Sequence, residues 1–251
     1  MKLIPVKDYE EMSRLGAEEI IGLVKTNPKA VLGLATGSTP TRLYQHLIED
    51  HERNHTSYKD VTTFNLDEYI GLDASHPQSY RSFMNHVLFR HIDIPLEQTF
   101  IPNGMAKDLE EECKRYDSLI KEKGGIDLQI LGIGVNGHIA FNEPGTPFES
   151  RTHIIPLTES TRVANSRFFN SMDEVPTHAI TMGIGTILES KEIILLISGK
   201  SKQEAMRRLL SEGQTTDFPA SALKNHPNVI IFADQEALEG TGFEGSEPIE
   251  I

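Results

Sequence analysis

The 251-residue sequence has few basic residues, a single cysteine and no long apolar run. It contains 24 Lys and Arg against 37 Asp and Glu, which gives a formal net charge of −13. Binding to nucleic acid requires clustered basic side chains that neutralise phosphates, so the composition excludes a nucleic-acid surface. An anionic membrane surface is disfavoured for the same reason. A small anionic substrate remains compatible, because it needs only a local pocket of donors.

The single cysteine, Cys113, cannot form an internal disulfide and lies in a segment with helical periodicity, where a buried, inert thiol is expected. No apolar run approaches membrane-spanning length, and the N-terminus lacks the hydrophobic core of a signal peptide. We therefore predict a soluble, cytoplasmic protein. The sequence also has no metal-ligand spacing, so no metal is expected.

Short apolar runs alternate with helical segments along the whole chain. Such continuous runs are typical of strands that helices bury on both faces. The pattern predicts one α/β domain over residues 1–251, with an open, largely parallel, Rossmann-like sheet and helices on both faces. The polar tail, residues 240–251, is expected to be loosely held. The expected strands are residues 30–35, 61–66, 127–134, 178–183, 192–198 and 228–233.

Helical periodicity appears in residues 8–24, 42–50 and 201–210, each with one apolar stripe. Asp8 is the expected N-cap of the first helix, which should lead directly into the first strand. In sheets of this class ligands bind beyond the carboxyl ends of the strands. The segments that follow the apolar runs are therefore the places to look for a site.

The segment LATGSTPTRLY follows the first of these strands. Gly37 permits a tight turn, Ser38 and Thr39 offer hydroxyls, and Pro40 suits the first position of a helix. Free backbone N–H groups at such a helix start can bind an anion. The segment has neither the lysine of a Walker A loop nor the dinucleotide glycine pattern. An ordinary capped helix start is an equally good interpretation of this segment alone.

In the second segment, FNLDEYIGL, Asp67 and Glu68 directly follow an expected strand. Acidic pairs of this kind are usually solvated turns. The functional alternative is a carboxylate that is partly desolvated at a strand end and therefore suited to act as a general base.

The third segment is LGIGVNGHIAFNEPG, residues 131–145. Its glycines allow the backbone to approach a ligand closely, and His138 can exchange a proton near neutral pH. Glu143 could orient and stabilise the imidazole. A structural histidine is the alternative, but three glycines, a histidine and a glutamate at the expected ligand edge favour function.

Basic side chains follow in two further segments. Arg162 and Arg167 lie on an expected helix in TRVANSRFF, whereas Lys200 and Lys202 lie in SGKSKQE after another strand. Single basic residues are usually solvated. An arginine and a lysine that converge with the Gly-Ser-Thr turn would instead indicate a sugar phosphate.

These motifs together resemble the glucosamine-6-phosphate deaminase family. The resemblance runs in order from about Leu3 to Asp234, which makes it far more specific than any one motif. The segments that carry it are ATGSTP, FNLDEYIGL, HPQSYRSFM, LGIGVNGHIAFNEPG, TRVANSRFF and PTHAITMGIGTIL.

The resemblance implies conversion of glucosamine 6-phosphate and water to fructose 6-phosphate and ammonia, without a metal or organic cofactor. His138, assisted by Glu143, would open the sugar ring. Asp67 would move a proton from C2 to C1 through an enolamine, and the imine at C2 would then hydrolyse. The implied phosphate ligands are Gly37, Ser38, Thr39, Arg167 and Lys202.

The sequence departs from the family pattern at two places. Many members carry Asp where this chain has Asn136, which can orient His138 by hydrogen bonding but cannot carry charge. Some members are hexamers activated by N-acetylglucosamine 6-phosphate through an Arg and a Lys, where this chain has His153 and Ile155. A homo-oligomer is compatible with the resemblance, whereas activation by that ligand is not expected.

Two other functions fit parts of the pattern. 6-Phosphogluconolactonases share the fold and a similar glycine–histidine loop, but typically lack the FNEP continuation. Sugar-phosphate-sensing domains of transcription regulators bind without chemistry and normally follow a DNA-binding helix-turn-helix. A binding domain has no need for Asp67, His138 and Glu143 together.

Overall fold

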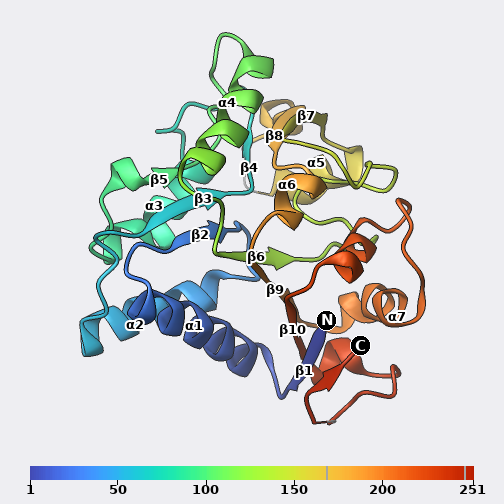
Figure 1. Ribbon diagram of the computed structural model, residues 1–251. Helices are drawn as coiled ribbons and strands as arrows, with labels where there is room; N and C mark the ends of the chain where they lie inside the picture. Colours follow the sequence, from blue (N-terminus) through green and yellow to red (C-terminus); the bar gives the residue numbers. More distant parts are fainter. Residues whose placement is uncertain (168, 246) are drawn as a thin grey trace.

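The computed structural model describes residues 1–167, 169–245 and 247–251, and its centre is an eight-stranded sheet. The strand order is β11-β1-β10-β9-β6-β2-β3-β5, and every neighbouring pair is parallel except β1 and β11. This confirms the predicted open, largely parallel sheet (Figure 1). The strands are β1 (Lys2–Val6), β2 (Val31–Leu34), β3 (Thr62–Asn65), β5 (Thr99–Phe100), β6 (Leu128–Gly132), β9 (Glu192–Ile197), β10 (Val229–Asp234) and β11 (Ile249–Glu250).

Helices cover both faces of this sheet. On strand β9, Ile194 and Leu196 pack on one side with α1 (Tyr9–Thr26), α2 (Thr41–Asn54) and α3 (Tyr80–Val87). Ile193 and Leu195 alternate with them and pack on the other side. That second layer contains α4 (Leu109–Glu122), α6 (Ile184–Leu188), α7 (Gln203–Ser211) and α8 (Gln235–Leu238). Burial on both faces explains why the strand sequences are continuously apolar.

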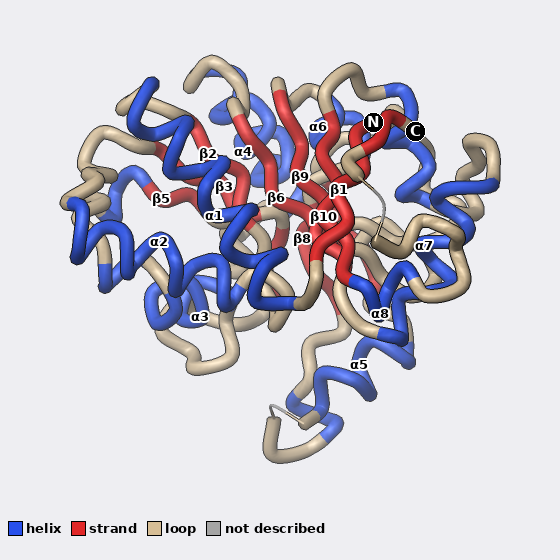
Figure 2. The backbone as a smooth tube through the Cα atoms, turned by 90° about the horizontal axis from the view of Figure 1, so that it is seen from below, coloured by secondary structure: helices blue, strands red, loops and turns tan. Residues whose placement is uncertain are grey.

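A second, antiparallel sheet of three strands lies beside the first. Its order is β4 (Asp67–Tyr69), β8 (His178–Thr181), β7 (His153–Pro156). The expectation that residues 178–183 join the parallel sheet was therefore wrong, because an apolar run reports burial and does not identify the partner strand. Figure 2 shows that α5 (Glu159–Ser166), which follows β7, stands out from the body of the molecule. The short 3₁₀ helices are η1 (Phe89–His91), η2 (Leu96–Gln98), η3 (Met172–Glu174), η4 (Lys200–Lys202) and η5 (Pro219–Asn225).

Both ends of the chain differ from expectation. Residues 2–6 form a strand that precedes the first helix, and the tail folds back so that Ile249 pairs with Leu3. The Ile251 N–H also donates to the Met1 carbonyl at 2.8 Å. The tail, of which Ser246 lies outside the described residues, is therefore part of the sheet edge. Its strand has only two residues, too few to give a periodic signal.

The predicted helices are confirmed in position. Asp8 caps α1, since its side chain accepts from the Glu11 N–H at 3.0 Å. Helix α2 begins at Thr41, so Pro40 is its N-cap and not its first helical residue. Cys113 is buried on α4, as predicted. None of the helices in the described ranges is both long and apolar enough to span a membrane.

The topology places a crevice at the carboxyl ends of β2 and β6. From β2 the chain continues outward through β3 to β5, whereas β6 lies on the other side of β2 and leads to β9 and β10. Segments that leave β2 and β6 therefore turn away from each other. Sheets of this kind bind ligands at such a switch point.

Candidate active site

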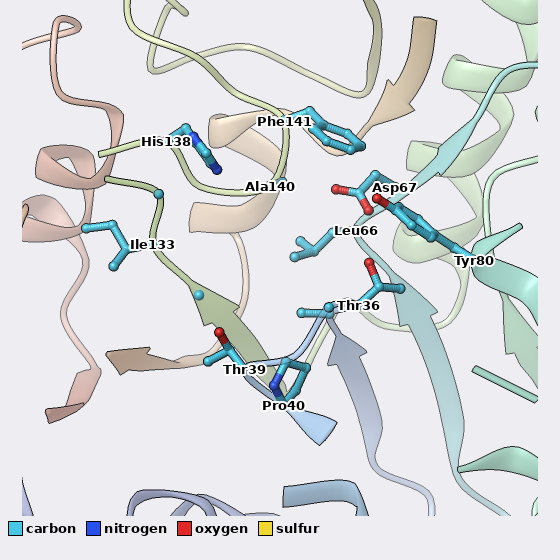
Figure 3. Close-up of a pocket in the computed structure, with 14 residues that line it drawn as sticks. Thr36, Thr39, Pro40, Leu66, Asp67, Tyr80, Ile133, His138, Ala140 and Phe141 are labelled. Atoms are coloured by element: carbon cyan, nitrogen blue, oxygen red, sulfur yellow. The ribbon is translucent and has the colours of Figure 1, made fainter. Parts of the chain in front are cut away.

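A cavity of about 210 Å³ lies at this switch point. Figure 3 shows Asp67 and His138 on opposite walls, with Thr39 and Pro40 below them. The walls come from the segments after β2, β3 and β6, together with the start of α3. The lining residues are Ala35, Thr36, Gly37, Thr39, Pro40, Leu66, Asp67, Tyr80, Gly132, Ile133, Gly134, His138, Ala140 and Phe141.

The turn between β2 and α2 is built to present N–H groups. Gly37 has φ +94°, a left-handed conformation that glycine adopts without steric cost. No described residue accepts a backbone hydrogen bond from Gly37, Ser38 or Thr39. Gly37 and Thr39 line the cavity, whereas Ser38 does not. Unpaired N–H groups at the start of a helix form a binding site for an anion.

Asp67 is buried at the point where the chain passes from the large sheet to the small one. Leu66 donates to the Leu34 carbonyl at 3.1 Å and accepts from Met182 at 2.7 Å, which fixes the crossover. The Asp67 side chain is only 7% exposed, and no described residue donates a hydrogen bond to it. Burial, with a smaller contribution from the Glu68 charge, raises the pKa of Asp67 to about 8. A carboxylate with a raised pKa is a stronger base than an ordinary aspartate carboxylate.

Glu68 points away from the cavity and holds the start of α3. Its carboxylate accepts from the N–H groups of Tyr69 at 2.8 Å, Tyr80 at 2.9 Å and Arg81 at 3.0 Å. The two carboxylates of the FNLDEY segment therefore have separate roles in the structure. Asp67 faces the cavity, and Glu68 ties β4 to the helix that supplies Tyr80.

His138, Asn136 and Glu143 form one hydrogen-bonded set. The Asn136 Oδ1 atom lies 2.8 Å from His138 Nδ1 and accepts from the His138 backbone N–H at 3.2 Å. The Asn136 Nδ2 group donates to Glu143 at 2.7 Å, whereas His138 Nδ1 and the Glu143 carboxylate are 3.7 Å apart. Asn136 thus bridges the histidine and the glutamate. Since Oδ1 can only accept, the neutral imidazole carries its proton on Nδ1 and keeps a lone pair on Nε2.

The electrostatic surroundings favour that neutral imidazole. Burial lowers the pKa of His138, the Glu143 charge opposes this shift, and the Lys202 charge adds to it. An unprotonated Nε2 can accept a proton from a substrate hydroxyl and return it to another oxygen.

Two glycines of the loop are required by close packing. A Cβ atom on Gly134 would lie 2.2 Å from the His138 ring, and one on Gly137 would lie 2.1 Å from Phe218. Gly137 also has φ +85°, and its carbonyl accepts from Ala220 at 2.8 Å. The loop that carries His138 is therefore packed against its own glycines and against the η5 segment.

The two lysines of the SGKSKQE segment differ in their surroundings. Lys202 is partly buried and near enough to His138 for its charge to act on the imidazole, and burial lowers the pKa of Lys202. Lys200 is exposed. Of the two, Lys202 is the one that the fold brings to the site.

Helix α5 carries the two predicted arginines to different places. Arg162 donates to the carbonyls of Met172 at 3.2 Å and Val175 at 3.1 Å, so it stabilises its own segment. Arg167 is the exposed C-cap of α5 and does not line the cavity. Phe168, the next residue of the TRVANSRFF motif, lies outside the described residues. Nearby, Asn165 donates to the Tyr69 hydroxyl at 2.8 Å.

Several lining residues were not predicted from the sequence, among them Thr36, Tyr80, Ala140 and Phe141. Tyr80 and Thr36 are hydrogen-bonded through their side chains, and the Tyr80 ring stacks on Phe141 at a centroid distance of 6.3 Å. Ala140 has φ +52°, an uncommon conformation for alanine, which turns Phe141 toward the cavity. Tyr80 and Thr36 lie within segments already recognised as motifs, but nothing in their spacing shows that they face a cavity.

The arrangement combines a buried base, a neutral histidine on the opposite wall and an anion-binding turn. Among the described residues, no group of three or more His, Cys, Asp or Glu side chains could hold a metal ion. Such a site suits a sugar phosphate whose C–H and O–H protons are transferred at separate atoms.

Comparison with known proteins shows the family to which the chain belongs. Residues 9–231 match the family described as glucosamine-6-phosphate isomerases/6-phosphogluconolactonase. The chain is 59% identical over 238 residues to a glucosamine-6-phosphate deaminase from Geobacillus sp. (strain WCH70), covering 95% of each chain. It is 53% identical over 237 residues to glucosamine-6-phosphate deaminase 1 from Bacillus subtilis (strain 168), covering 94% of this chain and 98% of the relative.

Solved structures of this family are also similar to the chain. A monomeric glucosamine-6-phosphate deaminase superposes with a TM-score of 0.92 at 53% identity, covering 94% of this chain and 98% of that one. A 6-phosphogluconolactonase from Trypanosoma cruzi superposes with a TM-score of 0.77 at 20% identity, over 95% of this chain and 96% of that one, which shows a shared fold alone. The chain therefore belongs to the glucosamine-6-phosphate isomerase/6-phosphogluconolactonase family.

Proposed function

We infer that this protein is a glucosamine-6-phosphate deaminase, which converts glucosamine 6-phosphate and water to fructose 6-phosphate and ammonia in amino-sugar catabolism. The relatives with that name are 52–59% identical over nearly the whole chain. The observation that carries the proposal is the placement of Asp67 and His138 on opposite walls of a cavity with an anion-binding turn at its base.

We propose that the phosphate binds at the Gly37–Thr39 turn, with Lys202 and Arg167 contributing charge. Free N–H groups and ammonium and guanidinium groups are the donors that a phosphate prefers. Lys202 already lies beside the site, whereas Arg167 must approach from the end of α5 when substrate is present. Each charge-assisted contact contributes about 1.5–3 kcal/mol.

His138 would open the pyranose ring. Its Nε2 atom accepts the proton of the C1 hydroxyl and returns a proton to the ring oxygen, which breaks the C1–O5 bond and leaves an aldehyde at C1. The bond to Asn136 keeps the imidazole oriented, and the Glu143 carboxylate stabilises the positive charge that develops between the two transfers.

Asp67 would then isomerise the open chain. Its carboxylate removes the C2 proton, and the aldehyde oxygen gains a proton to form an enolamine. Delivery of a proton to C1 gives an imine at C2, and water hydrolyses the imine to a ketone and ammonia. One carboxylate can reach both carbons because they are adjacent, and such general acid–base catalysis contributes about 10²–10⁴-fold.

The first test is an assay for ammonia and fructose 6-phosphate with glucosamine 6-phosphate, beside glucosamine without phosphate and 6-phosphogluconolactone. We expect ammonia from the amino-sugar phosphate, ammonia at a far lower rate from glucosamine without phosphate, and none from 6-phosphogluconolactone. Asp67→Asn should abolish turnover while substrate still binds, because the amide keeps the shape and cannot take a proton. Wild-type rates of solvent-deuterium exchange at C2 in Asp67→Asn would exclude Asp67 as the base.

We further propose that the catalytic unit is a single chain in the cytoplasm. The superposing deaminase, which is 53% identical to this chain, is described as monomeric. Light scattering at working enzyme concentration tests this proposal, and activity that appears only above a dimerisation threshold would contradict it.

A further inference from the structure

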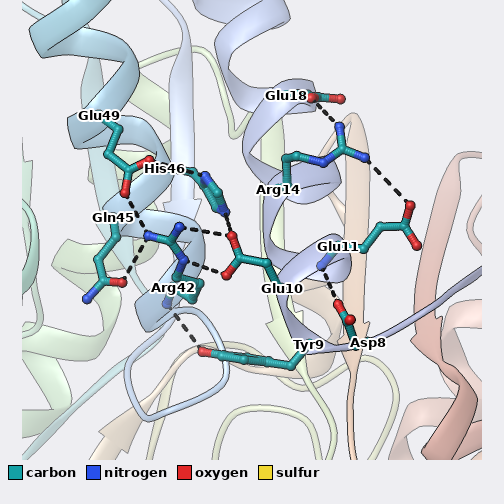
Figure 4. Close-up of polar contacts among 10 residues, drawn as sticks. All are labelled: Asp8, Tyr9, Glu10, Glu11, Arg14, Glu18, Arg42, Gln45, His46 and Glu49. Atoms are coloured by element: carbon teal, nitrogen blue, oxygen red, sulfur yellow. Dashed lines mark hydrogen bonds and ion pairs between the residues drawn. The ribbon is translucent and has the colours of Figure 1, made fainter.

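The turn proposed to bind phosphate is held from behind by a tyrosine on a different helix. Tyr9, the first residue of α1, donates from its hydroxyl to the Ser38 carbonyl at 2.7 Å. The same hydroxyl accepts from the backbone N–H of Arg42 at 3.2 Å (Figure 4). One oxygen atom therefore joins the middle of the turn to the first residues of α2.

These bonds decide which groups of the turn remain available to a ligand. The Ser38 carbonyl accepts from Tyr9 and from the Thr41 N–H at 3.3 Å, while the Gly37 carbonyl accepts from the Thr41 hydroxyl at 2.9 Å. Both carbonyl oxygens are thus engaged, and the N–H groups of the turn remain unpaired among the described residues. This matters because a carbonyl oxygen directed at a phosphate would repel it.

The neighbouring residue, Glu10, fixes the same junction through side chains. The Arg42 guanidinium donates to Glu10 at 2.7 and 2.9 Å and to Glu49 at 2.8 Å (Figure 4). Arg42 is therefore occupied by two carboxylates and joins α1 to α2. Although it lies near the start of α2, it is not among the residues that line the cavity.

We propose that Tyr9 is a positioning residue for substrate phosphate: its hydroxyl holds the Gly37–Thr39 turn so that the N–H groups face the cavity. Tyr9 does not line the cavity, so it acts through the turn and without contact to the sugar. The inference rests on the proposed function, because it assigns the turn to phosphate.

Tyr9→Phe keeps the aromatic ring and removes only the two hydrogen bonds. We expect KM for glucosamine 6-phosphate and the inhibition constant of inorganic phosphate to rise together, by about 3–10-fold. The value of kcat should change less than twofold, since His138 and Asp67 lie on other segments. For glucosamine without phosphate, kcat/KM should not change.

Tyr58→Phe is a matched control. Tyr58 is also a tyrosine near α2, but no described residue accepts or donates a hydrogen bond at its buried hydroxyl, and it does not line the cavity. It should leave both phosphate-dependent constants unchanged. Thermal unfolding of both variants shows whether Tyr9→Phe remains folded.

Unchanged affinity of Tyr9→Phe for inorganic phosphate would overturn the inference, and so would an equal loss of kcat/KM for glucosamine. Titration of the wild-type protein with inorganic phosphate and with fructose 6-phosphate separates this inference from the proposed function. If wild-type protein binds phosphate but releases no ammonia, the proposed reaction fails, and the loss of affinity in Tyr9→Phe still decides the role of Tyr9. If wild-type protein binds no phosphate, both proposals fail.

Discussion

Asp67 carries the clearest conflict between stability and function. Its side chain is buried and no described residue donates a hydrogen bond to it, so the ionised form that catalysis requires is the form that folding disfavours. Because the folded-state pKa of about 8 exceeds the ordinary value, the folded protein binds this proton more tightly than the unfolded chain does. Stability should therefore fall as pH rises from about 4 to about 8.

Asp67→Asn should stabilise the protein near neutral pH, because folding of the wild type must either protonate the Asp67 carboxylate or bury its charge, and the neutral amide avoids both. We expect a gain of up to about 4 kcal/mol at pH 7 that disappears near pH 4, where the carboxyl is neutral in both states. Urea unfolding of wild type and variant at pH 4, 5.5 and 7 measures it. The exposed Asp60→Asn should show no such pH-dependent gain, and a pH-independent difference for Asp67→Asn would contradict the burial argument.

Asn136 contacts His138 directly, so a charge placed at this position should change how His138 titrates. In Asn136→Asp a carboxylate replaces the amide oxygen 2.8 Å from Nδ1, so the imidazolium is favoured and the pKa of His138 rises. The limb of the pH profile of kcat/KM that reports His138 should move to higher pH. Asn136→Ala removes the hydrogen bond without adding charge and should not move that limb upward. If the pH profile of kcat/KM is the same in the wild type and both variants, Asn136 does not influence the titration of His138.

At the scale of elements, the His138 loop depends on the segment that packs beneath it. Gly137→Ala should cost about 1–2 kcal/mol for the positive φ and a further 1–3 kcal/mol for the contact with Phe218. Gly145→Ala is the matched control, since φ there is +94° and no atom lies within 4 Å of the added Cβ. Denaturant unfolding should show the larger loss at Gly137. Equal losses would mean that the loop moves away from Phe218 at little cost.

The two charged side chains proposed to bind phosphate lie on separate elements. The effects of removing each one can therefore be compared in single variants. Arg167→Ala and Lys202→Ala should each raise KM about 10-fold or more with smaller effects on kcat, because each removes one charge-assisted contact. The exposed Lys200→Ala is the control, and steady-state kinetics at constant ionic strength is the measurement. A raised KM for Lys200→Ala with none for Lys202→Ala would show that the two lysines have been assigned in the wrong order.

At the scale of the whole molecule, the chain does not retain the charges that activated family members use. His153 bonds the Arg151 carbonyl at 2.7 Å, and Ile155 is an aliphatic residue on β7. Arg151 itself pairs with Glu189 at 2.6 Å and lies 3.6 Å from Asp117. Among the described residues, a phosphate brought to this place would meet the carboxylates of Asp117 and Glu189 and an arginine already paired with them.

We therefore expect hyperbolic kinetics and no activation by N-acetylglucosamine 6-phosphate. Initial velocity against glucosamine 6-phosphate, with and without the acetylated sugar, tests this expectation. The unphosphorylated N-acetylglucosamine serves as the control ligand. A sigmoidal curve that becomes hyperbolic when the acetylated phosphate is added would show that other residues form an activator site.

Most of the elements, and the place of the chemistry among them, could be predicted from the sequence. Continuous apolar runs predicted β2, β3, β6, β9 and β10, because strands buried on both faces must be apolar throughout. The rule that ligands bind at the carboxyl ends of such strands then selected the segments that carry Asp67 and His138, which the structure places around one cavity.

Other features were decided only by the tertiary structure, because they depend on contacts between distant segments. The run at residues 178–183 predicted another strand of the parallel sheet, but β8 pairs with β4 and β7. The bridge from Asn136 to Glu143 requires the loop to fold back, and the Tyr9 hydroxyl meets the Ser38 carbonyl 29 residues away. The pattern of apolar residues in a sequence indicates which side chains are buried, but it does not identify the residues that they contact. The partner of each polar group is set by the packing of the whole chain.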